Sequence, residues 1–397
     1  MKSSTDGHRA AFGAVGDDPT KRSTGQEFFS LLEELDLDAI ADEFDIGRHT
    51  SIQEFEQHLK VAVLEGLEPS DSLETLAQQT TSNDRVDYMA ASTVSELTNT
   101  RDYRAVVQVV RALLHSPQLY RQRGVDRKRL EWLDRQVVAV DATHLALDAN
   151  VVVQDEGGRS DGSLEVRPED GGLKLHLAAR VDGEHKQPLA ATVTHPNTHE
   201  SSQFDELQTT LTGFTDLESP IQVFDRGFTD YDRFCELKAA GEDFVTVLKS
   251  NARTTVVDRL QAVEVRDEAG RRQVTDDLVE LGETGEVFRR VTVKDTDGDV
   301  TASLTTLSPA DYAPIDVVSI YTLRWLIEIL FRELKQYCNV EQFHSTTLNG
   351  ALFELFCTWI AYLLVQWFRH RHPLRGGVRA AIRFLQVNWN RSLPEYG

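Results

Sequence analysis

The chain has 397 residues, with 64 acidic against 42 basic side chains, so its formal net charge is −22. A hydrophobic content of 40% excludes a largely disordered protein, and the length allows two or three domains. Three cysteines without a Cys-x-x-Cys pair exclude a disulfide framework and a cysteine zinc site, and they fit a reducing compartment. The first residues have no apolar signal segment, so we expect a cytoplasmic protein.

The acidic residues follow a particular pattern. Arginine outnumbers lysine, and aspartate is abundant in loops such as residues 295–299. This pattern is typical of proteins from cells with very high internal salt, such as a halophilic archaeon, because a carboxylate-rich surface stays soluble there. An ordinary acidic protein is the alternative.

The first third of the chain is predicted to be helical. Residues 1–25 are polar and predict a disordered tail, whereas residues 26–135 have helical periodicity with polar turns. Two closely spaced helices are compatible with a helix-turn-helix-like DNA-binding domain, and a plain helical bundle fits equally well. Residues 101–135 favour the first interpretation, since they hold nine basic against four acidic residues.

From residue 136 the pattern changes to strands. Residues 136–147 form a short apolar run that contains a carboxylate, and the next two runs alternate with period two around a turn, as in a hairpin. A strand, a turn, a helix and a further strand are predicted between residues 219 and 250. Residues 251–311 are charged and contain at least two more strands, which predicts a β-rich insertion.

Two further segments complete the chain. Residues 351–368 form an 18-residue apolar run, which reaches the lower limit for a membrane span, but Glu354 and Gln366 interrupt it. We therefore expect a buried core helix. Residues 373–397 predict a basic C-terminal tail.

The segment 321–335 predicts an amphipathic helix with an unusual polar face. On a helical wheel Tyr321, Arg324, Glu328 and Lys335 lie within an arc of about 60°, opposite a leucine-rich face. A solvated stripe of ion pairs is the simple explanation. Trp325 borders the stripe, where it could pack or stack on a base.

Two aspartates lie at or near strand ends upstream of this helix. Asp141 is in the first strand and Asp225 follows a later strand. A carboxylate in such a place is costly unless it is paired or binds a metal ion. For any one of them a satisfied strand-end aspartate is the simpler explanation. Together with Glu328, they would form a cluster of hard oxygen ligands that suits Mg²⁺ and two-metal phosphoryl chemistry.

These residues resemble a known family. The spacing Tyr321, Arg324, Glu328, Lys335 is similar to the Y-R-E-K signature of the insertion-sequence-four transposases, the DDE group that includes the transposon-five enzyme. The family's first aspartate is closely followed by threonine, as at Asp141, and its second lies in a D-R-G-aromatic turn, as at Asp225. The resemblance covers about residues 136–372.

The resemblance implies a fold and an organisation. The expected fold is α/β, an RNase H-like mixed five-stranded sheet flanked by helices, with a β-rich insertion before the glutamate helix and an all-α N-terminal domain. The expected domains are a disordered tail (1–25), a helical DNA-binding domain (26–135), a catalytic domain (136–250 and 312–372), the insertion (251–311) and a basic tail (373–397).

The resemblance also implies roles for single residues. Asp141, Asp225 and Glu328 would be catalytic and would hold Mg²⁺, which Mn²⁺ could replace. The residues expected to contact DNA are Tyr321, Arg324, Lys335, Trp325 and Arg226.

The implied activity is cut-and-paste transposition on double-stranded DNA, by a homodimer bound to terminal inverted repeats and target DNA. An RNase H-fold nuclease without strand transfer and a non-catalytic DNA-binding relic are the alternatives. His195 and His199 have metal-like spacing, but Pro196 and Asn197 predict a loop there. His199–Glu200 stands where such transposases commonly have His-Asp, which makes it a weak accessory candidate.

Overall fold

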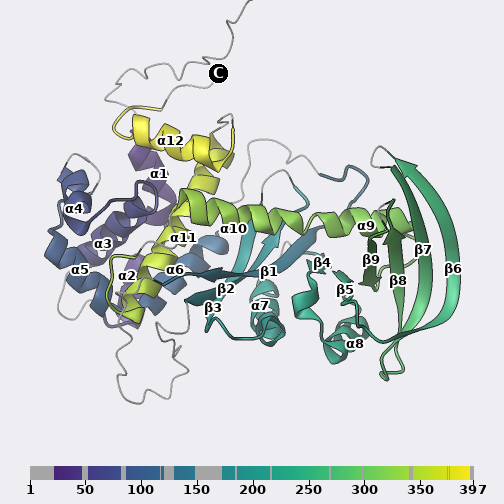
Figure 1. Cartoon of the computed structure of the whole chain (residues 1–397). Helices are drawn as coiled ribbons and strands as arrows, with labels where there is room; N and C mark the ends of the chain where they lie inside the picture. Colours follow the sequence, from purple (N-terminus) through teal and green to yellow (C-terminus); the bar gives the residue numbers. More distant parts are fainter. Residues whose placement is uncertain are drawn as a thin grey trace, which may run out of the picture. The chain divides into compact units, whose positions relative to one another are not determined.

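The computed structural model of the chain divides into two compact units, residues 1–123 with 333–397 and residues 124–332. We call them the helical unit and the strand unit (Figure 1). The residues that the structure describes are 22–46, 52–81, 86–116, 118–119, 129–147, 172–183, 186–214, 217–267, 270–296, 298–338, 343–372, 374 and 376–393.

The helical unit contains the predicted N-terminal helices together with two helices from the end of the chain. Residues 343–372, which the sequence interpretation grouped with the strands, belong to this unit. The segment 373–397 includes a helix with a buried face at Ile382 and Leu385. Its helices are α1 (Thr24–Glu33), α2 (Leu37–Glu43), α3 (Ile52–Glu65), α4 (Leu73–Thr81), α5 (Ala91–Thr100), α6 (Tyr103–Leu114), α11 (Leu348–Arg371) and α12 (Val378–Asn388).

Helix α11 forms the core of the helical unit. It is long and apolar enough to cross a membrane, but 83% of its most apolar window is buried within the protein. Its neighbours include α1, α3, α5, α6 and α12. The prediction of a buried core helix is confirmed. Thr347 begins the helix, because its hydroxyl accepts a hydrogen bond from the Gly350 amide.

The strand unit is built on one mixed sheet. Its strand order is β3-β2-β1-β4-β5-β9-β8-β7-β6, with β1, β4 and β5 parallel and the remaining pairs antiparallel. The strands are β1 (Val137–Leu145), β2 (Leu173–Arg180), β3 (Gln187–Thr194), β4 (Ile221–Phe224), β5 (Asp243–Val247), β6 (Thr254–Asp267), β7 (Gly270–Leu281), β8 (Val287–Lys294) and β9 (Val300–Thr305).

The sheet has nine strands where five were expected. The first five in spatial order, β3 to β5, are the strands that the sequence predicts between residues 136 and 250, and the predicted hairpin is β2–β3. The insertion does not form a separate layer, because β9 pairs with the open edge of β5 and the sheet continues through β8, β7 and β6. Pairing that edge satisfies backbone groups that would otherwise be unpaired.

Helices cover both faces of this sheet. In Figure 1, α9 (Pro314–Thr322) lies on one face, and α7 (Phe204–Leu211) and α8 (Tyr231–Ala240) lie on the other. Single turns of 3-10 helix precede α7 and α8, at Glu200–Gln203 (η2) and Arg226–Phe228 (η3). The helix predicted over residues 321–335 is wrong as one element, because the chain turns at residues 323–324 before α10 (Trp325–Tyr337) begins.

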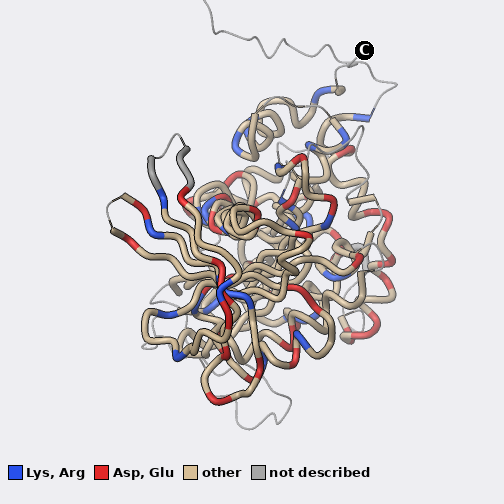
Figure 2. The backbone as a smooth tube through the Cα atoms, turned by 90° about the vertical axis from the view of Figure 1, so that its right-hand side faces the viewer, with Lys and Arg blue, Asp and Glu red and all other residues tan. Residues whose placement is uncertain are grey.

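In the part of the chain that the structure describes, charged residues occur on helices, strands and loops alike. Figure 2 shows Asp and Glu, in red, along helices, strands and loops, with Lys and Arg between them. One pair is fully enclosed: Arg289 of β8 donates to both oxygens of Asp276 of β7 at 2.9 Å each, and both side chains are buried. Such a pair holds two neighbouring strands together.

Candidate active site

The two aspartates lie next to each other on adjacent parallel strands. Val140 of β1 is in register with Phe224 of β4, so Asp141 and Asp225 are the next residues along each strand. Asp225 ends β4 and caps the following turn, since its Oδ1 accepts a hydrogen bond from the Gly227 amide at 2.6 Å. The parallel pairing therefore brings both carboxylates to the place where β4 ends.

Arg324 connects this place to the following helix. Its guanidinium donates to Oδ2 of Asp141 at 2.9 Å and to Oε1 of Glu328 at 2.5 Å. The side chains of Arg324 and Asp141 are 18% and 13% exposed, so the pair is largely shielded from water. The structure thus brings Asp141, Arg324 and Glu328 together, and it pairs Arg324 with carboxylates rather than leaving it free.

Tyr321 and Trp325 flank Arg324. The Arg324 guanidinium lies over the Tyr321 ring at 5.8 Å, and burial raises the pKa of the Tyr321 hydroxyl. Tyr321 belongs to α9 and Glu328 to α10, so the polar stripe spans two helices joined at Arg324. Trp325 is 54% exposed, which leaves its ring open to stacking.

Burial raises the pKa of Asp141 to about 7. The Ala142 amide and Arg324 oppose this shift, whereas the negative charges of Asp225 and Glu200 add to it. Like charges that converge on one place are typical of sites that receive a cation or a proton.

Glu200 is the residue that the sequence reasoning underrated. It begins η2, and Lys174 of β2 holds its Oε1 at 3.0 Å. Its other oxygen lies against the turn after β4, where a Cβ on Gly227 would overlap it and would be 2.8 Å from Oδ1 of Asp225. The glycine of the Asp-Arg-Gly turn is therefore the sequence signal that another group approaches this backbone closely.

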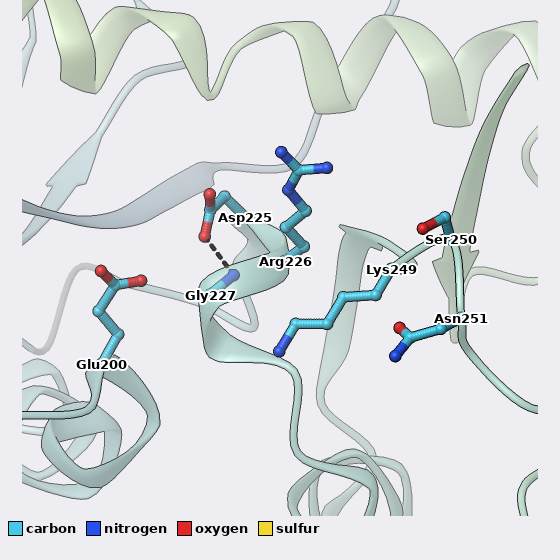
Figure 3. A pocket seen from close by; sticks show the side chains of 7 residues that line it. All are labelled: Glu200, Asp225, Arg226, Gly227, Lys249, Ser250 and Asn251. Carbon is cyan, nitrogen blue, oxygen red and sulfur yellow. Dashed lines mark hydrogen bonds between the residues drawn. The ribbon is translucent and has the colours of Figure 1, made fainter. Parts of the chain in front are cut away.

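A hollow of about 650 Å³ opens beside these groups (Figure 3). In Figure 3, Glu200 points toward Asp225 from one side, and Lys249 reaches from the other side toward the Arg226–Gly227 turn. Its lining residues are Glu200, Asp225, Arg226, Gly227, Lys249, Ser250 and Asn251.

The carboxylates are the right kind of ligand for a divalent cation, but they are not spaced to bind one in this structure. Aspartate and glutamate oxygens are the ligands that Mg²⁺ prefers. Across the described residues, no three His, Cys, Asp or Glu side chains are close enough to hold a metal ion. The Arg324 guanidinium occupies the space between Asp141 and Glu328. The donor types therefore suit the metal, whereas their present spacing does not, because the guanidinium stands between two of the carboxylates.

Other candidates lie elsewhere or are engaged locally. Lys335 lies in the part of α10 that belongs to the helical unit. His199 Nδ1 is 2.8 Å from the Ser201 hydroxyl, and His195 Nδ1 accepts a hydrogen bond from the Asn197 amide, so both rings are held in a turn. Arg226 is exposed at the hollow.

The basic segment 101–135 is only partly available for binding. Arg101 is buried in the helical unit and donates to the Glu54 carbonyl, Arg104 pairs with Asp102, and Arg135 pairs with Asp243. Four of the nine cations lie outside the described residues: Arg121, Arg123, Arg127 and Lys128.

Comparison with known proteins identifies the class. Two aspartates lie on adjacent parallel strands of a mixed sheet in this α/β protein, and Arg324 joins one of them to a glutamate on a helix. Residues 132–364, more than half of the chain, match the family described as Transposase DDE domain. The chain belongs to this family, and the three acidic residues lie within the matched range.

Two relatives carry corresponding names. The chain is 28% identical over 200 residues to "Putative transposase y4zB" of Sinorhizobium fredii, which covers 49% of this chain and 53% of that protein. It is 26% identical over 231 residues to "Probable transposase for insertion sequence element IS5377" of Geobacillus stearothermophilus, with 57% of each chain covered. The chain thus spans about half the length of these relatives.

Proposed function

We propose that this protein is an active DNA transposase of the insertion-sequence-four type, which binds terminal inverted repeats and cuts and rejoins DNA strands. The observation that carries the proposal is the meeting of Asp141, Arg324 and Glu328 beside Asp225, where β4 ends. The family match and the names of the relatives support it.

In this proposal Asp141, Asp225 and Glu328 hold Mg²⁺, which Mn²⁺ can replace. Bound metal would activate a water or a 3′-hydroxyl and stabilise the leaving oxygen of an in-line displacement. Until then Arg324 keeps Asp141 and Glu328 neutralised, since two acidic groups that share one guanidinium would repel each other without it. When it withdraws, Arg324 becomes available to a phosphate of the DNA, to which a guanidinium can donate two parallel hydrogen bonds.

The remaining parts of the proposal concern the fold, the DNA contacts and the assembly. The strand unit is an RNase H-like core extended by the insertion strands. Tyr321, Arg324, Lys335, Trp325 and Arg226 contact transposon-end DNA. The protein acts in the cytoplasm of a halophilic archaeon, as a homodimer on its DNA. At molar salt the screening length is about 3 Å, so binding relies on close contacts to phosphates.

A cleavage assay tests the proposal. The substrate is a duplex that carries the inverted repeat found beside the gene and its flanking DNA, incubated with the full chain and Mg²⁺ or Mn²⁺. We expect cleavage at the repeat boundary and joining of the released end to a target plasmid. Cleavage without joining favours the nuclease, and repeat binding without cleavage favours the relic.

A further inference from the structure

The strand unit leaves a few cations without carboxylate partners, although the chain is strongly acidic. Most of its described lysines and arginines are bonded to Asp or Glu, as in Arg180–Asp182, Lys238–Glu286 and Arg290–Asp277. In a chain with 64 acidic against 42 basic residues, an unpaired cation is the exception. Among the described residues of the strand unit, these exceptions include Arg226, Lys249 and Arg253, which have no acidic group within ion-pair distance.

These three cations lie along two adjoining hollows. The hollow at Asp225 shares Lys249 and Asn251 with a second one of about 560 Å³, which reaches Arg253. The lining of the second hollow is Thr229, Tyr231, Lys249, Asn251, Ala252, Arg253, Gly282 and Glu283. The surface therefore runs from the carboxylates, past Lys249, to the beginning of β6. We call it the β5 track.

The backbone that carries the track is anchored. The Leu248 amide donates to the Ala302 carbonyl at 2.8 Å, which ties the end of β5 to β9. The Ala252 amide donates to the Lys249 carbonyl at 2.9 Å, and the Gly282 amide donates to the Arg253 carbonyl at 2.9 Å. A ligand that meets this loop therefore meets cations on a backbone that is already ordered.

The chemistry of the lining selects the ligand. Beyond the carboxylates of Glu200 and Asp225, the track offers ammonium and guanidinium groups with hydroxyl and amide side chains, and Glu283 is the one further acidic residue of its lining. A small apolar ligand needs a predominantly hydrophobic wall, and the lining of both hollows is predominantly polar. Spaced cations with neutral donors match a chain of phosphates, because each phosphate accepts charge-assisted hydrogen bonds.

We propose that Lys249 and Arg253, with Asn251 between them, bind successive phosphates of the DNA strand that continues from the scissile position along β5. This inference rests on the proposed function and deepens it, since it states where one strand runs beyond the carboxylates. Neither residue touches the reacting phosphate. They fix the path of the strand and thereby the position of the bond that is cut.

The test is a set of full-chain variants with a matched control. Lys249→Ala and Arg253→Ala, singly and together, remove cations of the track. Lys294→Ala removes an exposed, unpaired cation from the end of β8, outside both hollows. Lys249→Arg retains the charge. Melting temperatures confirm that each variant is folded.

Binding is measured to the inverted-repeat duplex of the cleavage assay, as a function of salt and with single phosphates around the cleavage site replaced by neutral methylphosphonates. We expect the double variant to bind about tenfold more weakly. Its plot of log affinity against log salt should be less steep by about two units. The Lys294 and Lys249→Arg variants should stay close to the wild type.

The replacement of single phosphates shows which part of the DNA strand contacts the track. In the wild type, neutralising a few consecutive phosphates on one side of the cleavage site should weaken binding. In the double variant the same replacements should have no further effect, because the partners are gone. A scan that is identical in wild type and double variant overturns the inference, as does an equal loss in Lys294→Ala. Failure of the wild type to bind or cut the repeat refutes the proposed function, and the inference with it.

Discussion

Two largely buried carboxyl groups of this protein both have a raised pKa, in very different surroundings. Burial raises the pKa of Asp141 in the strand unit and of Glu354 in the helical unit, each to about 7. Around Asp141, further acidic groups and one shared guanidinium gather beside an open hollow. Glu354 instead accepts hydrogen bonds from the His344 amide and the Ser345 hydroxyl, where His344 also contacts Glu65.

The difference between these two surroundings shows which feature distinguishes a functional carboxyl group from a structural one. Glu354 has its hydrogen bonds satisfied by its own chain, so its raised pKa is a cost of building the helical core. Asp141 is crowded by other acidic groups, and its one cation is shared with Glu328. A raised pKa alone is thus no evidence of function; convergent acidic groups at an open surface are stronger evidence.

The largest expected effect is on cleavage, where the aspartates of the strand unit and Glu354 of the helical unit should differ completely. Asp141→Asn and Asp225→Asn should each reduce end cleavage at least a thousandfold, because several kcal/mol of transition-state stabilisation are lost. Glu354→Gln, the matched control, should cleave at nearly the wild-type rate. Rates on the repeat duplex, with binding measured separately, test this. Substantial cleavage by either asparagine variant would remove the basis of the assignment.

The next effect concerns the cation shared between the carboxylates. Arg324→Ala should reduce cleavage about a hundredfold, the scale of losing one preorganised charge donor. Because Asp141 and Glu328 then lose their counter-ion, the free energy of unfolding should also fall by about 1–3 kcal/mol. Cleavage rate and denaturant unfolding of the same sample measure both. An unchanged rate with lowered stability would make Arg324 a purely structural residue.

A third, smaller effect is on the pH dependence of stability, and it concerns Glu354 alone. The folded pKa of Glu354, about 7, lies above its ordinary value of 4.5, so between these values the folded chain binds a proton that the unfolded chain does not. Stability from this group is therefore lost as pH rises through 7. Glu354→Gln should stabilise the protein at pH 8 by about 1–3 kcal/mol and have little effect at pH 5.

Denaturant unfolding at the two pH values checks this prediction. The contact between His344 and Glu65 raises the pKa of His344, and its contribution also fades as pH rises. The pH dependence that comes from His344 should therefore remain in the Glu354→Gln variant. Equal stabilisation at both pH values would contradict a titrating Glu354.

The smallest effect probes the crowding around Asp225. Gly227→Ala should lower stability by about 1 kcal/mol, because the new Cβ displaces the Glu200 carboxylate, whose flexible end can move. If Glu200 is the obstacle, Glu200→Ala should absorb most of the cost of the second change. Thermal melting of the two single variants and the double variant gives this coupling, and strictly additive losses would point to Asp225 instead.

The sequence predicted those features that depend on local pattern. Alternation and apolar runs predicted β1 to β5 and the two aspartates at or near strand ends, and the length of the apolar run predicted α11. The long hairpin β6–β7 was missed because charged and exposed residues interrupt its alternation. The turn at residues 323–324 was missed because neither glycine nor proline marks it.

Contacts between distant parts of the chain could not be predicted from the sequence. Arg324 and Asp141 are separated by 183 positions, and only the fold shows that they meet. Glu200 reaches the site through η2, and the sequence marked it only by the His199–Glu200 pair and by the glycine at position 227. The nine-stranded sheet follows from β9 pairing with β5, and no single-strand pattern records that choice of partner.

The enclosed pair of Asp276 and Arg289 has a consequence for assembly of the insertion. Asp276 and Asp277 follow each other on β7 and therefore point to opposite faces of the sheet. A slip of one residue that moves Asp276 into the place of Asp277 would put Thr275 beside Arg289 and leave the guanidinium without its carboxylate, in a place that water does not reach. The pair thus favours one register of β7 against β8. Because salt screens enclosed charges far less than exposed ones, this preference is kept at high salt concentration.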